Sequence, residues 1–264
     1  MILRLERPED HYAVESLTRA AFWKSNWSSE PRICDEHLLV HRLRKCPSYV
    51  PELNYVAEID GKIVGHIIYT KSKIVDTSGK EYEMLTFGPL SAMPEYQGNG
   101  IGKALMLHTF EVARDLGYRA VIIFGHPDYY PRVGFRRAAA FGITTPDSKT
   151  FDPFMVLPLY NGALDGITGR YYIDPVYETL TEKDTLAFDK KFPPKELHKP
   201  ILMDMLLGHL EPAAQQAIQS LKLETLAQMQ TKSQRDISSL DGVNENAIEI
   251  IRTIMVENGL RWGK

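Results

Sequence analysis

The sequence of 264 residues has little cysteine, no long apolar run and almost no excess of charge of either sign. Its two cysteines, Cys34 and Cys46, do not form a CxxC pair, which argues against a disulfide scaffold or a cysteine-rich zinc site. So few cysteines are typical of a reducing compartment, and we expect a cytoplasmic protein that needs no metal. No segment approaches the roughly 20 apolar residues of a membrane helix, so no membrane partner is expected.

The balance of charge gives no reason to expect a nucleic-acid partner. The net charge is −3, and it divides evenly: residues 1–200 carry 25 basic and 26 acidic side chains, and residues 201–264 carry 6 and 8. Nonspecific nucleic-acid affinity comes mainly from counterions released by basic side chains. Neither part of the chain has the surplus of Lys and Arg that this requires.

Hydrophobic periodicity predicts an α/β arrangement followed by a helical region. Residues 54–59 and 62–69 read as strands joined by Asp60-Gly61, a strong hairpin signal, and the second strand continues towards Val75. The remaining strands are expected over 2–5, 82–92, 119–124, 139–145, 154–160 and 168–174, and helices over 8–23, 35–45 and 100–116.

A glycine-rich turn joins the strand over 82–92 to the helix over 100–116. It reads Gln97-Gly98-Asn99-Gly100-Ile101-Gly102-Lys103. Glycine allows close approach of a ligand to the backbone, and the first N–H groups of a helix lack intrahelical acceptors. The turn therefore predicts an anion site, most simply for phosphate. A tight turn that binds no ligand is the alternative.

Two common phosphate motifs do not fit this turn. A GxGxxG motif that starts at Gly98 requires glycine where Lys103 stands, and one that starts at Gly100 requires glycine at position 105. A Walker A motif requires Ser or Thr after Lys103, where Ala104 stands. The sequence therefore argues against a dinucleotide-binding fold and a P-loop NTPase.

The turn and two flanking segments together resemble the GNAT superfamily of acetyl-CoA-dependent N-acetyltransferases. The turn matches the pattern Q/R-x-x-G-x-G/A, residues 88–96 (GPLSAMPEY) resemble the family's fourth strand, and residues 130–135 (YPRVGF) resemble its Y-x-x-x-G-F element. The resemblance covers about residues 1–160. It implies a mixed, mostly antiparallel sheet with splayed parallel central strands flanked by helices.

The resemblance also implies a site for acetyl-CoA between the splayed strands 82–92 and 119–125. Backbone groups at Leu90, Ser91 and Ala92 would bind the pantetheine arm. Backbone N–H groups of the turn would bind the pyrophosphate. The Lys103 side chain would add a positive charge there, or would be solvated instead. The turn residues assigned to the cofactor are Gln97, Gly98, Asn99, Gly100, Ile101, Gly102 and Lys103.

Tyr130 matches the family's general acid, since an ordinary tyrosine is protonated at pH 7; a purely structural ring is the alternative. The residue that acts as general base for the acceptor amine is not identified by the sequence. Some members use a glutamate at the position of Thr86, which cannot serve. Glu83, His126 and Asp128 are candidates, with His126 preferred because it follows a strand and an ordinary histidine titrates near neutrality, although it could equally cap a turn. Deprotonation through water is a further alternative.

The acceptor pocket is expected to draw on residues 136–176, which have few charges. Packing in the core is the preferred interpretation for most of their aromatic side chains. These include Phe141, Phe151, Phe154, Tyr160, Tyr171 and Tyr172.

The last part of the chain predicts a small all-α domain. The expected division is a GNAT domain over 1–180, a charged linker with two prolines over 181–204, and a helical domain over 205–264. Residues 239–243 (SLDGV) resemble a helix-hairpin-helix turn, and residues 212–262 resemble the C-terminal domain of the RNA polymerase alpha subunit. No basic residue follows the turn, so a protein partner or a homodimer contact is expected in place of DNA.

The sequence thus predicts transfer of an acetyl group from acetyl-CoA to a primary amine of a small molecule or protein. A non-catalytic acyl-CoA sensor that acts through the helical domain is the first alternative, and a nucleic-acid-associated regulator is the second.

Overall fold

The computed structural model describes residues 1–23, 34–195, 203–257, 260 and 262. Their contacts divide them into two compact units, with the division after Pro194. The N-terminal unit contains the whole sheet, and the C-terminal unit contains helices and turns. No helix in the described part of the chain is long and apolar enough to cross a membrane.

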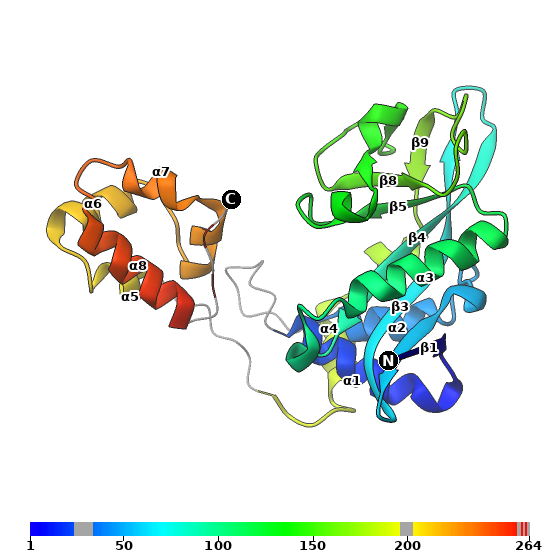
Figure 1. The fold of residues 1–264 in the computed structure, drawn as a ribbon, viewed down its shortest axis with the longest axis horizontal. Helices are drawn as coiled ribbons and strands as arrows, with labels where there is room; N and C mark the ends of the chain where they lie inside the picture. The colour runs from blue at the N-terminus through cyan, green and yellow to red at the C-terminus, as the bar shows by residue number, and fades with distance from the viewer. Residues whose placement is uncertain (24–33, 196–202, 258–259, 261, 263–264) are drawn as a thin grey trace. The chain divides into compact units, whose positions relative to one another are not determined.

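The N-terminal unit is built on one mixed sheet, which in the described residues has nine strands (Figure 1). The main order is β1-β2-β3-β4-β5-β8-β6, and β9 pairs with β3 and β7. Only the pairs β4–β5 and β7–β9 are parallel. The strands are β1 Ile2–Leu5, β2 Tyr55–Ile59, β3 Lys62–Val75, β4 Glu81–Ala92, β5 Ala120–Phe124, β6 Arg136–Arg137, β7 Ile143–Thr144, β8 Phe154–Pro158 and β9 Gly169–Tyr172.

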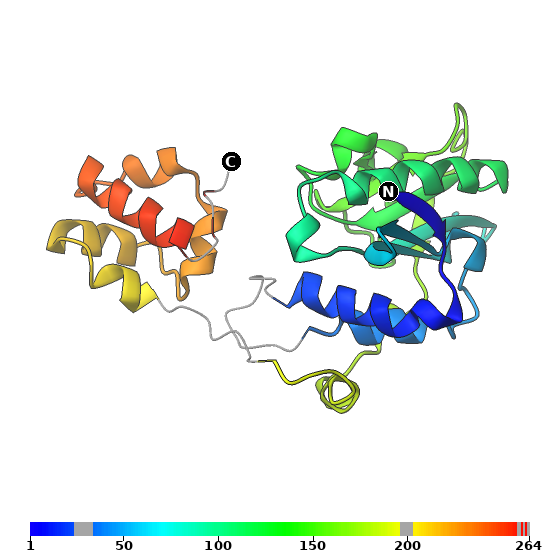
Figure 2. The same cartoon turned by 60° about the horizontal axis from the view of Figure 1, so that its bottom comes forward.

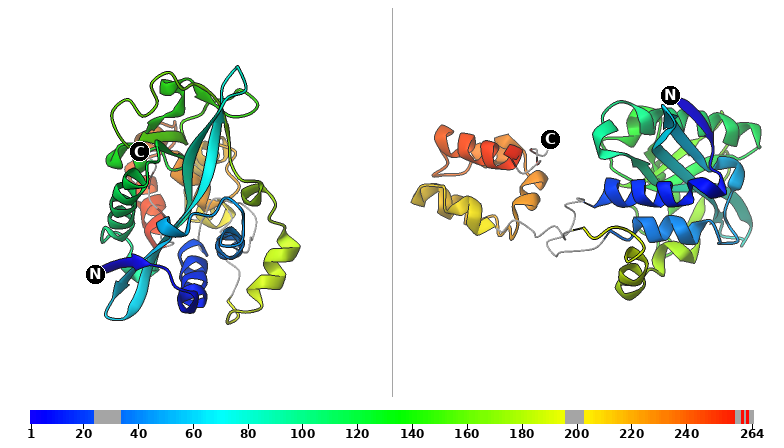
Figure 3. Two further views of the ribbon diagram at one scale, coloured as in Figure 1. Left: turned by 90° about the vertical axis from the view of Figure 1, so that its right-hand side faces the viewer. Right: turned by 90° about the horizontal axis from the view of Figure 1, so that it is seen from below.

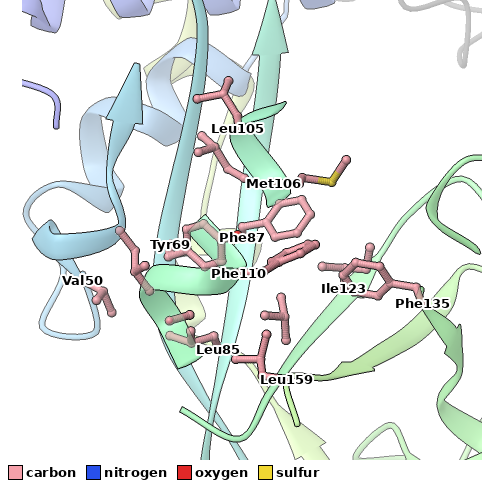
Figure 4. Close-up of a cluster of buried hydrophobic side chains, with 14 of the residues drawn as sticks. Val50, Tyr69, Leu85, Phe87, Leu105, Met106, Phe110, Ile123, Phe135 and Leu159 are labelled. Atoms are coloured by element: carbon pink, nitrogen blue, oxygen red, sulfur yellow. The ribbon is translucent and has the colours of Figure 1, made fainter. Parts of the chain in front are cut away.

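Helices cover both faces of the sheet (Figure 2). Helix α3 (Ile101–Asp115) lies on one face, and α1 (His11–Phe22) and α2 (Glu36–Leu43) lie on the other. The apolar stripe of α3 packs with alternate residues of β3, β4 and β5, as Figure 4 shows for Leu105, Phe110 and Phe87. Burial of this stripe fixes which strand residues face α3 and which face α1 and α2.

Most of the predicted elements are confirmed, including the hairpin at Asp60-Gly61 and the parallel crossover from β4 through α3 to β5. The strand predicted over 139–145 is wrong for most of its length. Ala138–Phe141 form a 3-10 helix, Gly142 ends it at φ 66°, and only Ile143–Thr144 are strand. The segment is apolar, as the pattern indicated, but the left-handed conformation of Gly142 turns the chain before a longer strand can form.

The segment expected to be linker differs at its start, because α4 (Glu182–Asp189) lies inside it. The Thr181 side chain caps this helix by accepting from the Asp184 N–H at 3.2 Å. Helix α4 lies beside α2 (Figure 3). Phe188 packs against the His41 ring of α2, and the Arg42 guanidinium donates to the Asp184 carboxylate at 2.8 Å. The helix depends on these tertiary contacts, which its weak apolar period does not reveal.

The C-terminal unit contains α5 (Met203–Leu207), α6 (Pro212–Gln219), α7 (Gln234–Ser238) and α8 (Glu245–Glu257) around its own core. Gly242 lies in the turn between α7 and α8 at φ 89°. A Cβ at Gly242 would lie 2.8 Å from the Ala213 carbonyl oxygen of α6. The glycine therefore lets the turn pack on this unit's own backbone. The resemblance to the RNA polymerase domain stays a prediction.

Candidate active site

The parallel strands β4 and β5 form a fork. They pair only at Leu85 and Val121, and beyond that point β4 pairs with β3 while β5 pairs with β8. Ile67 pairs with Leu90 and Tyr69 with Phe87, so β4 has one extra residue between these pairs. Such a bulge bends the strand. The two strands consequently separate towards the ends that carry the glycine-rich turn and the Y-x-x-x-G-F element.

The glycine-rich turn presents backbone donors at the N-terminus of α3. Gly98 and Gly100 have φ of 82° and 80°, and Gly100 is the N-cap residue. Five backbone N–H groups of the turn have no hydrogen-bond acceptor among the described residues. These N–H groups are those of Gly98, Gly100, Ile101, Gly102 and Lys103. With the positive end of the helix dipole, this arrangement of donors can bind an anion.

The neighbouring residues hold this turn in place. The Gln97 side-chain amide donates to the Ala92 carbonyl at 3.2 Å, which ties the turn to the end of β4. The Ser91 hydroxyl lies 3.0 Å from the Thr18 hydroxyl of α1, so its side chain points to the face opposite α3. Asn99 donates its N–H to the Tyr96 carbonyl at 3.4 Å within the turn.

Tyr130 stands on the α3 side of the fork. Its ring packs against Phe87 of β4 and Phe135, with centroids 5.9 and 5.5 Å away. Burial raises the pKa of Tyr130 to about 12. With this pKa the phenol is protonated at neutral pH. Its hydroxyl has no hydrogen-bond partner in the described part of the chain, so it can donate to a ligand.

Gly125 makes the position of Tyr130 possible. A Cβ at Gly125 would lie 2.3 Å from the Tyr130 ring, closer than any real contact. Because β5 ends at Phe124, the glycine directly after it lets the ring lie over the end of the strand. The sequence pattern identified Tyr130, but only the tertiary contact explains Gly125.

Tyr129 is a further side chain at this site, to which the sequence assigned no role. Its hydroxyl lies 3.4 Å, and the Leu90 side chain 3.5 Å, from the position that a Cβ at Gly102 would occupy. The tyrosine therefore reaches from the turn after β5 to the first turn of α3. Its ring is 39% exposed, and burial of the rest raises the pKa of its hydroxyl.

Two of the candidate bases are engaged in other contacts. Glu83 precedes the β4–β5 pair at Leu85 and forms an ion pair with Lys71 at 3.0 Å. The His126 Nδ1 accepts from the Asp128 N–H at 3.3 Å and so caps the turn after β5. Thr86 is buried. This arrangement provides an acid and backbone donors, while Glu83 and His126 are engaged in contacts outside the fork.

A separate surface cavity of about 400 Å³ lies at the other end of β4. The ion pairs Lys71–Glu83 and Lys73–Glu81 line it, together with Asp174. Among the residues that the structure describes, no group of three or more His, Cys, Asp or Glu side chains could hold a metal ion.

The fold, the fork and the glycine-rich turn are similar to those of acyltransferases of the GNAT type. Residues 19–139 match the acetyltransferase (GNAT) family model, and the chain is similar to GNAT N-acetyltransferases. It is 29% identical over 170 residues to the uncharacterized N-acetyltransferase YhbS of Escherichia coli K12, covering 64% of this chain and 93% of the relative. It is 38% identical over 101 residues to the uncharacterized N-acetyltransferase YjhQ of the same organism, and this match covers 38% of this chain and 55% of the relative.

Two solved structures share the fold. The structure of YhbS from Escherichia coli in complex with CoA matches with a TM-score of 0.58 and 26% identity, and covers 69% of this chain and 93% of that chain. A GNAT acetyltransferase from Brucella melitensis in complex with acetyl-CoA matches with a TM-score of 0.53 and 27% identity, and covers 67% of this chain and 97% of that chain.

Proposed function

We propose that the N-terminal unit binds acetyl-CoA in the β4–β5 fork and transfers its acetyl group to a primary amine. The observation that carries the proposal is the set of unsatisfied N–H donors at the N-terminus of α3, beside the fork and Tyr130. The two solved relatives, which contain CoA and acetyl-CoA, support the same ligand here.

The roles of the cofactor-binding residues follow from this arrangement. The N–H groups of Gly98 and of Gly100 to Lys103 would bind the pyrophosphate, and Gln97 would hold the turn. The backbone of Leu90 to Ala92, which has no partner strand on its fork side within the described chain, would pair with the pantetheine arm. We add Tyr129, whose hydroxyl beside Gly102 would donate to the same anion.

The reaction needs little from the protein beyond positioning and a proton. A neutral amine attacks the thioester carbonyl, the N–C bond forms, and N–H donors stabilise the oxyanion. The C–S bond then breaks, Tyr130 donates its proton to the departing thiolate, and the amine nitrogen gives up a proton to water. With a pKa of about 12, Tyr130 is a stronger acid than water but stays protonated before the step.

The test combines binding and turnover. Calorimetry should show saturable binding of acetyl-CoA, and Tyr130→Phe should lower kcat for amine acetylation about a hundredfold with little change in acetyl-CoA affinity. Tyr129→Phe should instead weaken acetyl-CoA binding several-fold and leave kcat nearly unchanged, because it removes one hydrogen bond to the ligand. Absence of binding would refute the proposal. Binding without turnover of any amine would favour the sensor.

We further propose that the C-terminal unit binds a protein partner or a second copy of this chain. Its hairpin turn packs on Ala213, and its charge is negative. Both features argue against use of this turn to bind a nucleic-acid backbone. Sedimentation at several protein concentrations would test self-association, with a concentration-independent monomer as the contrary result for the homodimer.

A further inference from the structure

The fork has a second face, which α3 does not cover. Side chains alternate along a strand, so Phe87 and Ile123 pack towards α3 while Thr86 and Ile122 point the other way. The anion site and Tyr130 lie on the α3 side. An acceptor that attacks a thioester held in the fork must therefore approach from the opposite face.

Two tyrosines approach the diverging strands from that opposite face. The Tyr171 hydroxyl lies 3.5 Å from the Ile122 carbonyl of β5, and the Tyr177 hydroxyl lies 3.5 Å from the Gly88 carbonyl of β4. Gly88 itself is open: a Cβ there would meet nothing within 4 Å. The bulge of β4 thus faces open space where the two strands separate.

An exposed aromatic stack lies on the other strand of the fork, because Phe124 is three residues beyond Val121 on β5 as Gly88 is three residues beyond Leu85 on β4. Phe124, the last residue of β5, stacks on Phe154 and Phe151 with centroids 4.9 and 5.7 Å away and planes 26° and 18° apart. Phe124 is 47% and Phe151 46% exposed, although Phe154 beneath them is fully buried. Phe124 also directly precedes Gly125, on which the Tyr130 ring rests. Large apolar rings left half-exposed beside a reactive centre are a feature of ligand-binding surfaces.

The side chains named on this face carry no formal charge at neutral pH. They are the phenols of Tyr171 and Tyr177, the rings of Phe124, Phe151 and Phe154, and the buried Ile122 and Thr86, and burial raises the pKa of Tyr171 to about 12. The nearest acidic side chain along the chain, Asp152, is paired with Arg137 at 3.0 Å. A cationic or highly polar acceptor would lose its hydration here without a carboxylate to replace it.

We propose that the acceptor is an arylalkylamine, a primary amine on a short chain that ends in an aromatic ring. This rests on the proposed acetyltransferase function. The ring stacks on Phe124 and Phe151, and the amine reaches the thioester through the opening at Gly88. Loss of hydration in this aromatic site lowers the pKa of the ammonium group, so the amine reaches the thioester neutral. That accounts for catalysis without Glu83 or His126 as the base.

The experiment compares 2-phenylethylamine with 1,4-diaminobutane in the full-length protein, by release of free thiol from acetyl-CoA. We expect kcat/KM for 2-phenylethylamine to be at least tenfold higher. Phe124→Ala and Phe151→Ala should each lower that value about tenfold, mainly through KM, and should leave acetyl-CoA affinity unchanged. Both side chains are half-exposed, so the variants should fold.

The matched control is Tyr160→Ala. Tyr160 is 40% exposed but follows β8 at Pro158, which pairs with Ala120 at the far end of β5 from the fork. Equal effects of Phe124→Ala and Tyr160→Ala, or a preference for 1,4-diaminobutane, would overturn the acceptor assignment alone. Absence of acetyl-CoA binding would overturn the proposed function as well.

Discussion

At the scale of single residues, the site depends on small side chains that make room for large ones. Gly125 is the clearest case, because a single methyl group there would occupy the space of the Tyr130 ring. Gly102 has the same relation to Tyr129 and Leu90, with contacts of 3.4 and 3.5 Å that are ordinary for a Cβ. Substitution at Gly125 should therefore disturb the acid, whereas Gly102 has space for a methyl group.

We expect Gly125→Ala to lower kcat by ten- to a hundredfold, because the displaced Tyr130 hydroxyl no longer reaches the departing sulfur. Acetyl-CoA affinity should change little, since the anion site is untouched. Steady-state kinetics together with calorimetry separates the two effects. Gly208→Ala is the control, because its Cβ would meet its nearest atom at an ordinary 3.5 Å. Wild-type kcat in Gly125→Ala would show that the ring position is not critical.

His66 lies in a buried polar network and gives a second residue-scale prediction. Its Nε2 lies 2.7 Å from the Asn54 side-chain oxygen, and its Nδ1 is buried without a partner among the described residues. Burial lowers the pKa of His66 to about 4. The unfolded chain, with a pKa near 6.5, therefore binds a proton that the folded protein does not bind between these values.

Stability should consequently fall as the pH drops from 6.5 towards 4, by up to about 1.4 kcal/mol per pH unit from this group. His66→Gln keeps an amide donor for Asn54 and removes the titration. Urea midpoints at pH 7.0 and 5.0 should differ less in His66→Gln than in wild type. Identical pH dependence of the two proteins would contradict the assignment to His66.

At the scale of elements, the strands and the main helices follow from periodicity, whereas α4 depends on distant partners. The Arg19 guanidinium of α1 donates to the Asp189 carboxylate at 2.6 and 2.8 Å, and both side chains are largely buried. Arg19 also lies over the Trp23 ring at 4.4 Å. Arg19 and Asp189 are 170 residues apart in the sequence, so no local sequence pattern predicts their contact.

Asp189→Asn should destabilise the N-terminal unit by about 2 kcal/mol, because it leaves a buried guanidinium without its counter-charge. Asp152→Asn is the matched control, since its pair with Arg137 is exposed, and should cost roughly 0.5 kcal/mol or less. Urea unfolding followed by tryptophan fluorescence measures both. Equal and small effects would mean that α4 docks through Phe188 and Phe192 alone.

At the scale of the whole molecule, two separate cores define two units. No residue of the cluster around Met203, Leu226 and Ile251 belongs to the clusters of the sheet unit. The expected boundary at 181–204 and the observed division after Pro194 differ because α4 packs with the sheet unit. The catalytic residues that we propose all lie in the sheet unit.

Gly242→Ala should therefore weaken the helical unit without affecting acetyl transfer. The added methyl meets the Ala213 carbonyl at 2.8 Å and the residue must keep φ 89°, which together should cost more than about 1 kcal/mol. Scanning calorimetry should show one transition moved to lower temperature and a second unchanged, with wild-type kcat/KM at 25 °C. A loss of activity would instead show that the helical unit controls the site, as the sensor hypothesis requires.

The sequence alone predicted the main strands and helices of the sheet unit and the glycine-rich turn, because periodicity and turn residues are local properties of the chain, and the family resemblance added Tyr130 and the splayed strands. Only the tertiary structure decided where the fork of β4 and β5 opens, the reach of Tyr129 to Gly102, the docking of α4 and the aromatic face around Phe124. Each of these joins residues that are distant in sequence. Their contacts depend on strand register and on the faces that burial selects, which local patterns do not specify.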